Sequence, residues 1–166
     1  IPAVITPFDK NRSIDYDKLN KHIDFLIDQQ SHGLVSCGTT GESPTLDHEE
    51  HKKITEVIIK RSNKKVPIMA GCGSNSTKES IELVKHAQSV GANASLLVSP
   101  YYNKPSQDGL FQHFSEIANS VPSLPIYLYN IPGRSVVNIN QVTMTMLSKI
   151  NNIVGVKDAT SDLSLP

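Results

Sequence analysis

Short runs rich in apolar and β-branched residues recur along this chain about every thirty residues, the length of one βα unit. The six runs cover residues 3–6, 34–37, 67–70, 94–99, 126–129 and 153–157. The stretches between them have helical periodicity. Strict alternation of this kind predicts parallel strands covered by helices.

The helical stretches carry apolar residues three or four positions apart. Four of the five predicted helical faces contain Leu19, Ile23, Leu26 and Ile27; Ile54, Val57 and Ile58; Leu110, Phe111, Phe114 and Ile117; and Val142, Met146 and Leu147. The pairs at 47–50 and 76–79 have the spacing of capping boxes. Gly33 and Gly91 stand where helices are expected to end.

The pattern is compatible with an α/β (β/α)8 TIM barrel and with an open doubly wound sheet, because strand order is not visible in one sequence. A (β/α)8 barrel takes about 250 residues, whereas this chain has 166. For a barrel, residues 1–166 are therefore expected to form a single partial domain with about the first six strands and five helices. The C-terminal part of the barrel would be absent.

Composition excludes several classes of function. The 16 basic residues balance the 16 acidic ones, so nucleic acid is not an expected partner. No apolar run approaches the roughly 18 residues that span a bilayer, and no signal peptide is visible, so we expect a cytoplasmic protein without membrane contact. Cys37 and Cys72 lack the spacing of a metal site and are expected to be small buried residues.

Three motifs follow the predicted strands or open a helix. The turn at 38–43, GTTGES, offers hydroxyl and N–H groups to a carboxylate or phosphate, although an ordinary βα turn explains it equally well. Residues 71–76, GCGSNS, begin like a dinucleotide fingerprint but lack its third glycine and follow the wrong strand, which favours a turn. His48 and His51 are three positions apart, not four as in zinc proteases, which favours a solvated helical face or a regulatory site and predicts no metal.

A lysine at the end of an apolar strand is the most distinctive candidate. Lys157 ends the run 153–157 and shares a face with Gly155, so a lysine that faces a barrel interior would have free space beside it. Desolvation at a barrel mouth would favour the neutral amine, which can attack a ketone. Tyrosines at the ends of neighbouring strands, such as Tyr129, would be apolar lids in the simpler interpretation.

Four blocks together resemble one known family. They are GTTGES at 38–43, SPYYNKPSQDG at 99–109, YNIPGRS at 129–135 and GVKDAT at 155–160. Their order and spacing, one at each strand end, resemble the dihydrodipicolinate synthase / N-acetylneuraminate lyase family over essentially the whole chain. Arg134 favours the synthase branch, in which an arginine of this block holds the carboxylate of aspartate semialdehyde.

The resemblance implies a Schiff-base (class I) aldolase-type lyase that condenses pyruvate with L-aspartate 4-semialdehyde in the diaminopimelate and lysine pathway. Lys157 would form the imine and Tyr129 would transfer protons, while Thr39 would link Tyr129 to Tyr102 of a neighbouring subunit. Thr40 would hold the pyruvate carboxylate. The imine is itself the electron sink, so no cofactor is expected.

Regulation and assembly are implied in the same way. The family contains members inhibited by L-lysine, and the matching positions are Ser43, His48, His51, Asn75, Glu79 and Tyr101. Pro44 stands where a smaller residue such as alanine is common, so strong inhibition is not expected. The resemblance also implies a homo-oligomer, a homotetramer built as a dimer of dimers.

Two alternatives remain at this point. The first is an N-acetylneuraminate lyase-like enzyme or another 2-oxo acid aldolase. The second is an inactive barrel fragment that is no enzyme.

Overall fold

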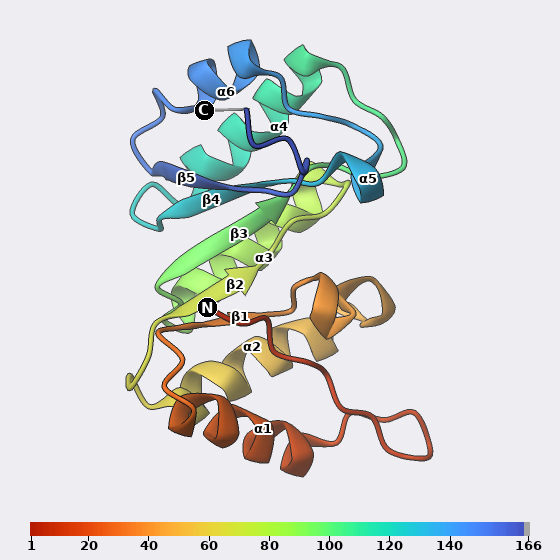
Figure 1. Cartoon of the computed structure of the whole chain (residues 1–166), viewed down its shortest axis with the longest axis vertical. Helices are drawn as coiled ribbons and strands as arrows, with labels where there is room; N and C mark the ends of the chain where they lie inside the picture. The colour runs from red at the N-terminus through yellow and green to blue at the C-terminus, as the bar shows by residue number, and fades with distance from the viewer. Residues whose placement is uncertain (165–166) are drawn as a thin grey trace. The chain divides into compact units, whose positions relative to one another are not determined.

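Two parallel strands form the centre of the first compact unit, which comprises residues 1–71 and 86–93. In the computed structural model, which describes residues 1–164, β1 (Leu34–Ser36) pairs with β2 (Ile68–Gly71). The helices α1 (Tyr16–Asp28) and α2 (His48–Ser62) pack against each other beside them (Figure 1). The buried apolar residues of this unit form one core, which contains Val4, Leu19, Ile23, Leu34, Cys37, Ile54, Ile58 and Ile68.

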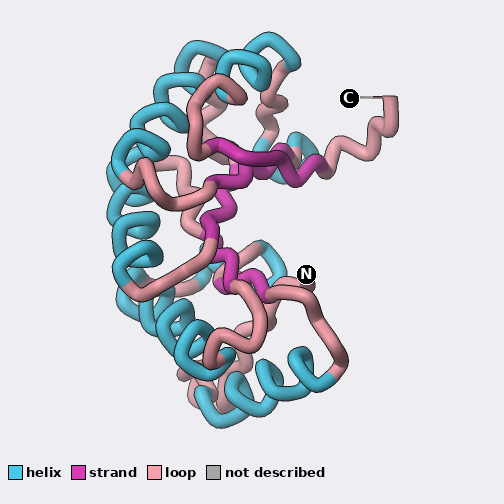
Figure 2. Tube along the Cα trace, turned by 90° about the vertical axis from the view of Figure 1, so that its left-hand side faces the viewer, coloured by secondary structure: helices cyan, strands magenta, loops and turns pink. Residues whose placement is uncertain are grey.

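The second unit comprises residues 72–85 and 94–166, of which 165 and 166 lie outside the described residues. Its three strands are parallel and adjacent in chain order: β3 (Ala94–Val98), β4 (Ile126–Asn130) and β5 (Ile153–Asp158). The helices α4 (Gln107–Ser120) and α6 (Gln141–Leu147) pack together, and α5 (Pro132–Ser135) is a single turn after β4. In each unit, helices lie along one face of the strands (Figure 2).

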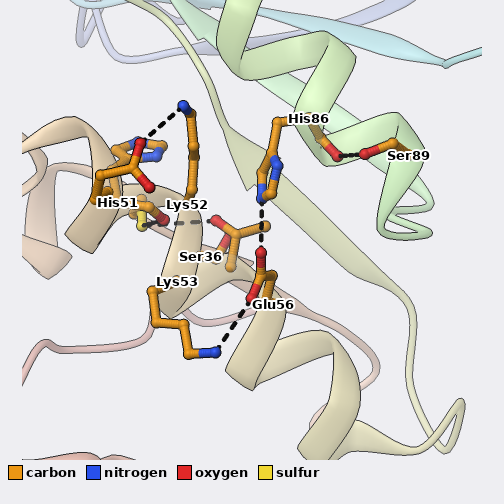
Figure 3. Close-up of polar contacts among 10 residues, drawn as sticks. Ser36, His51, Lys52, Lys53, Glu56, His86 and Ser89 are labelled. Carbon is orange, nitrogen blue, oxygen red and sulfur yellow. Dashed lines mark hydrogen bonds and ion pairs between the residues drawn. The ribbon is translucent and has the colours of Figure 1, made fainter.

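The helix α3 (Thr77–Ser89) belongs to both units, since its last turn is part of the first unit. In that turn, His86 Nε2 lies 3.5 Å from Glu56 Oε1 of α2. Lys53 donates to the other oxygen of Glu56, and Ser36 Oγ of β1 lies 3.1 Å from Thr55 Oγ1 of α2 (Figure 3). These polar contacts join the helices and the strand around the apolar core.

The predicted α/β alternation is confirmed, with one correction at the N-terminus. Within residues 1–164, only five of the six predicted strands form. Residues 3–6 make an isolated bridge between Ala3 and Val35. Pro2 has no N–H to extend the ladder, and the Thr6 hydroxyl turns to the carbonyl of Gly41 at 2.7 Å. The prediction of one partial barrel domain for residues 1–166 remains a prediction.

Most helix boundaries follow the predicted signals. Asp47 and Glu50 form a complete capping box, and Gly91, with φ of 92°, follows the end of α3. Gly33 is not the stop of α1. The helix ends at Asp28, because Gln30 adopts a left-handed conformation (φ 60°) and Ser31 N donates to Leu26 O, as in a Schellman motif.

One expectation about a helical face is corrected. Val142 and Met146 of α6 are exposed, and the buried face of this helix is formed by Thr143 and Leu147.

Both cysteines are buried, as predicted. Among the helices of residues 1–164, none is long and apolar enough to cross a membrane.

Candidate active site

The carboxyl ends of β4 and β5 bring the two central candidates together. Tyr129 and Lys157 are register partners in the parallel pair, so their side chains emerge on the same face. The Lys157 ammonium lies 4.1 Å from the centroid of the Tyr129 ring. Tyr129 is only 7% exposed, while Lys157 is exposed. A buried tyrosine thus holds its ring beside an accessible amine, within the distance of a cation–π contact.

Gly155 has a different role from the predicted one. The space beside Lys157 is not free, because Tyr127 of β4, the register partner of Gly155, occupies it. A Cβ atom at position 155 would lie 2.7 Å from Tyr127 Cε1 and 2.8 Å from Cδ1. The glycine therefore lets the Tyr127 ring approach the backbone of β5 closely, two register pairs before the Tyr129–Lys157 contact.

The loop after β3 carries the two adjacent tyrosines. Ser99 N donates to Tyr129 O at 3.0 Å, which ties the start of this loop to β4. Tyr102 has a left-handed backbone (φ 74°) and is 87% exposed, so its ring extends into solvent. Asn75 Nδ2 donates to Tyr101 O at 3.2 Å, and Asn103 Nδ2 donates to Asn75 O at the same distance.

The GTTGES turn belongs to the first unit. Thr39–Gly41 form one turn of 3-10 helix, with Glu42 in a left-handed conformation. The side chains of Thr39 and Thr40 are exposed, and the Thr6 hydroxyl holds the turn in place by its hydrogen bond to Gly41 O. A Cβ at Gly41 would lie 2.8 Å from Val4 O, so only glycine fits where this turn crosses residue 4.

The GCGSNS segment is explained by packing. A Cβ at Gly71 would lie 2.5 Å from Cys37 O, and one at Gly73 would lie 2.3 Å from Val98 N. Both glycines therefore permit close approach of a backbone to a neighbouring strand. This observation supports the turn interpretation over the dinucleotide one.

The predicted regulatory positions are distributed over both units. Asn75 and Tyr101 are in contact, and the Glu79 carboxylate accepts a hydrogen bond from Ser74 Oγ. In the first unit, Ser43 begins the 3-10 turn η2 (Ser43–Thr45), which also contains Pro44. His48 is exposed in the first turn of α2, but His51 is only 8% exposed. The expectation of a solvated face is therefore wrong for His51, because the next turn of α2 faces the core.

Comparison with known proteins assigns the family. A model of the Dihydrodipicolinate synthetase family matches residues 1–165. This chain belongs to that family. A 4-hydroxy-tetrahydrodipicolinate synthase of Rhizobium meliloti is 56% identical over 161 residues, which are 96% of this chain and 54% of the relative. A second one, from Agrobacterium fabrum, is 56% identical over 98% of this chain and 55% of its own length.

Solved structures of the family have the same fold. The chloride-inhibited dihydrodipicolinate synthase of Acinetobacter baumannii, complexed with pyruvate, has a TM-score of 0.95 and 49% identity over 98% of this chain and 55% of that one. The Cyanidioschyzon merolae structure with lysine bound has a TM-score of 0.94 and 39% identity over 98% of this chain and 55% of that one. This chain thus has the fold of part of a (β/α)8 barrel and spans about half the length of these relatives.

The sequence identifies Arg134 as a candidate, but only the structure shows where its side chain lies. It lies on the single-turn helix α5 directly after β4, and its side chain is exposed. The Ser135 hydroxyl donates to Ile131 O at 3.0 Å, and Val136 ends the turn in a left-handed conformation. A short helical turn therefore presents the arginine close in sequence to Tyr129. Thr39 and Thr40 belong to the first unit, whereas Tyr129 and Arg134 belong to the second. The predicted roles of the two threonines therefore remain predictions.

Proposed function

We propose that this chain carries the Schiff-base half of a 4-hydroxy-tetrahydrodipicolinate synthase, a lyase that condenses pyruvate with L-aspartate 4-semialdehyde. The observation that supports it most is the contact between the Lys157 amine and the Tyr129 ring at the carboxyl ends of adjacent parallel strands. Ligands of α/β barrels bind at this end of the strands. The relatives from Rhizobium meliloti and Agrobacterium fabrum bear the name of this activity.

The first step of the proposed reaction is capture of pyruvate by Lys157. The neutral amine attacks the C2 carbonyl carbon, and loss of water forms the imine. Removal of a C3 proton then gives an enamine, because the protonated imine nitrogen accepts the electron pair that the broken C–H bond leaves behind. In this proposal, Tyr129 moves the protons and Thr40 holds the pyruvate carboxylate.

The second step joins the enamine C3 to the aldehyde carbon of aspartate semialdehyde. Arg134 would bind the carboxylate of this substrate, for which an exposed guanidinium on a short helix is suited. Hydrolysis of the new imine would return the Lys157 amine. Thr39 would connect Tyr129 with Tyr102 from a neighbouring subunit.

The exposure of Tyr102 supports the proposed homo-oligomer. A tyrosine that is 87% exposed with a left-handed backbone contributes little to the core of its own chain. In the proposed dimer of dimers, its ring would enter the site of the adjacent subunit. The expected place of the reaction is the cytoplasm.

L-Lysine is the proposed inhibitor, since the Cyanidioschyzon merolae relative has lysine bound. Asn75, Tyr101 and Glu79 would supply part of its site, and Ser43, His48 and His51 the rest. The Asn75–Tyr101 hydrogen bond supports the grouping of the first set.

Mass spectrometry after treatment with pyruvate and borohydride tests the proposal. The expected result is a reduced pyruvate adduct at Lys157, absent from Lys157→Ala and unchanged in Lys149→Ala, which removes another exposed lysine of the same unit. The intact protein is compared with a chimera in which residues 1–164 replace the matching half of the Rhizobium meliloti relative. Absence of an adduct from a folded chimera would overturn the Schiff-base mechanism.

A substrate comparison separates the synthase from the other aldolases. Turnover with aspartate semialdehyde and none with N-acetylneuraminate is expected. Arg134→Ala should raise the KM for the aldehyde by about 10- to 100-fold, the loss of a charged hydrogen bond, and leave pyruvate capture intact. Cleavage of N-acetylneuraminate would instead support the sugar-acid lyase. An adduct on the chimera but not on the 166-residue chain would support the inactive fragment.

A further inference from the structure

Asn130, the residue after Tyr129, has a buried side-chain amide whose donor and acceptor atoms are all engaged. It is 2% exposed. Its Nδ2 donates to Asn138 Oδ1 at 2.7 Å and to Asp158 Oδ2 at 3.1 Å, while its Oδ1 accepts from Ile139 N at 3.1 Å. A buried amide with complete hydrogen bonding is fixed in one orientation.

The bond to Asp158 links the same two strands that present the candidate site. Tyr129 is paired with Lys157, and the next pair in register is Asn130 with Asp158. Because successive side chains of a strand point to opposite faces, the two pairs lie back to back. The Tyr129–Lys157 contact is on one face, and the Asn130–Asp158 hydrogen bond is on the other.

Asp158 is itself held in place. Its Oδ1 accepts from Thr160 N at 2.9 Å and from Thr160 Oγ1 at 2.5 Å, which leaves Oδ2 for Asn130. These hydrogen bonds lower the pKa of the Asp158 carboxyl group, and the two from Thr160 have the largest effect. The carboxylate is therefore the charged acceptor of a fixed hydrogen-bond pattern at neutral pH.

The ladder between β4 and β5 changes register near its start. The shift lies between Ile126 and Tyr127, so the pair Ile126–Ile153 does not set the alignment of the four continuous pairs that follow and end at Asn130–Asp158. At the carboxyl end, Ala159 N donates to Asn130 O at 2.9 Å and closes the backbone ladder. The Asn130 side chain adds the link between side chains and also fixes the loop that precedes α6.

We infer that Asn130 is a positioning residue, which holds Lys157 against Tyr129 by locking the ends of β4 and β5 through Asp158. This inference rests on the proposed function for its consequence in catalysis. It assigns Asn130 no contact with substrate, and it concerns only the second unit.

The test uses an exchange of the two side chains in the intact protein. Asn130→Asp is nearly isosteric and keeps the acceptor for Ile139 N, but it removes both Nδ2 donors and places a second carboxylate beside Asp158. Asn130→Asp with Asp158→Asn restores one amide and one carboxylate in the opposite order. Asn151→Asp, at an exposed asparagine just before β5, adds the same charge to the same unit and is the matched control.

Two readouts are measured well below each melting temperature. The first is the rate of pyruvate capture by borohydride trapping. We expect a fall of at least about tenfold at pH 8 for Asn130→Asp and partial recovery at lower pH, where the two carboxylates share a proton. Recovery to within about threefold is expected for the exchanged pair, and no change for Asn151→Asp.

The second readout is the NMR shift of the Lys157 ε-methylene protons, which the Tyr129 ring moves upfield. The single variant should lose this shift and the exchanged pair should regain it. Wild-type shift and capture rate in folded Asn130→Asp would overturn the inference, as would an exchanged pair that regains thermal stability but neither readout. If the wild type captures no pyruvate, the proposed function fails, and the NMR shift still decides whether Asn130 positions Lys157.

Discussion

Substitution of Gly155 by alanine is the perturbation whose cost follows most directly from the geometry. The new Cβ would lie 2.7 Å from Tyr127 Cε1, whereas ordinary contacts begin at 3.4 Å, so the ring or the strand has to move by about 0.7 Å. Tyr127 is partly buried between neighbouring strands, and it cannot swing away freely. Overpacking of this kind costs about 1–3 kcal/mol.

The gain from replacing glycine offsets part of that cost. Alanine reduces the conformational entropy of the unfolded chain, worth about 0.4–1 kcal/mol. The expected net loss is therefore about 0–2.6 kcal/mol of unfolding free energy, or roughly 0–10 °C in melting temperature for a chain of this size. Because the clash lies two register pairs before Lys157, on the same face of the sheet, pyruvate capture should slow as well.

Urea unfolding followed by circular dichroism measures the loss, with two controls. Gly133→Ala should change the unfolding free energy by less than about 0.5 kcal/mol, because a Cβ there has no neighbour within 4 Å. Tyr127→Leu removes the clashing ring atoms, so its combination with Gly155→Ala should cost less than the sum of the single changes. Strict additivity, or an equal loss for Gly133→Ala, would refute the assigned contact.

Two further predictions concern stability. Burial lowers the pKa of His113 from 6.5 to about 4, so the folded state favours the neutral ring. The contribution of this shift to the unfolding free energy is complete above pH 6.5 and is lost as the pH falls through 4. It amounts to about 3 kcal/mol in total. The difference in unfolding free energy between wild type and His113→Gln should therefore shrink from pH 7 to pH 4, and a constant difference would contradict the assignment. Asp47→Ala breaks the capping box of α2 and should cost about 1 kcal/mol by thermal melting, against little change for Glu49→Ala in the same turn; equal effects would show that the cap is unimportant.

Local physical rules made much of the fold predictable from sequence. Helical periodicity and the capping box located α2, and Gly91 marked the end of α3, because these signals act over only a few residues. The first strand was overpredicted, since a β-rich run forms a strand only where a partner is available along its length. The end of α1 was misplaced at Gly33, because Gln30 takes a left-handed conformation that glycine usually takes.

The candidate residues were predictable one by one, but their arrangement was not. Residue type and strand-end position singled out Lys157 and Tyr129, and the family resemblance added Arg134. Asn130 was missed, although its position directly after a candidate tyrosine at a strand end was a usable signal. Its importance comes from three hydrogen bonds to residues 8, 9 and 28 positions away, which no local pattern contains.

The sequence by itself determined the alternation of strands and helices and singled out Lys157 as the proposed reactive amine, because periodicity and residue chemistry depend on local sequence. Only the tertiary structure decided what lies beside that amine. The pairing of β4 with β5 filled the space over Gly155 with Tyr127 and brought Lys157 within 4.1 Å of the Tyr129 ring centroid. Such contacts depend on strand register, which is set by hydrogen bonds between segments far apart in the chain.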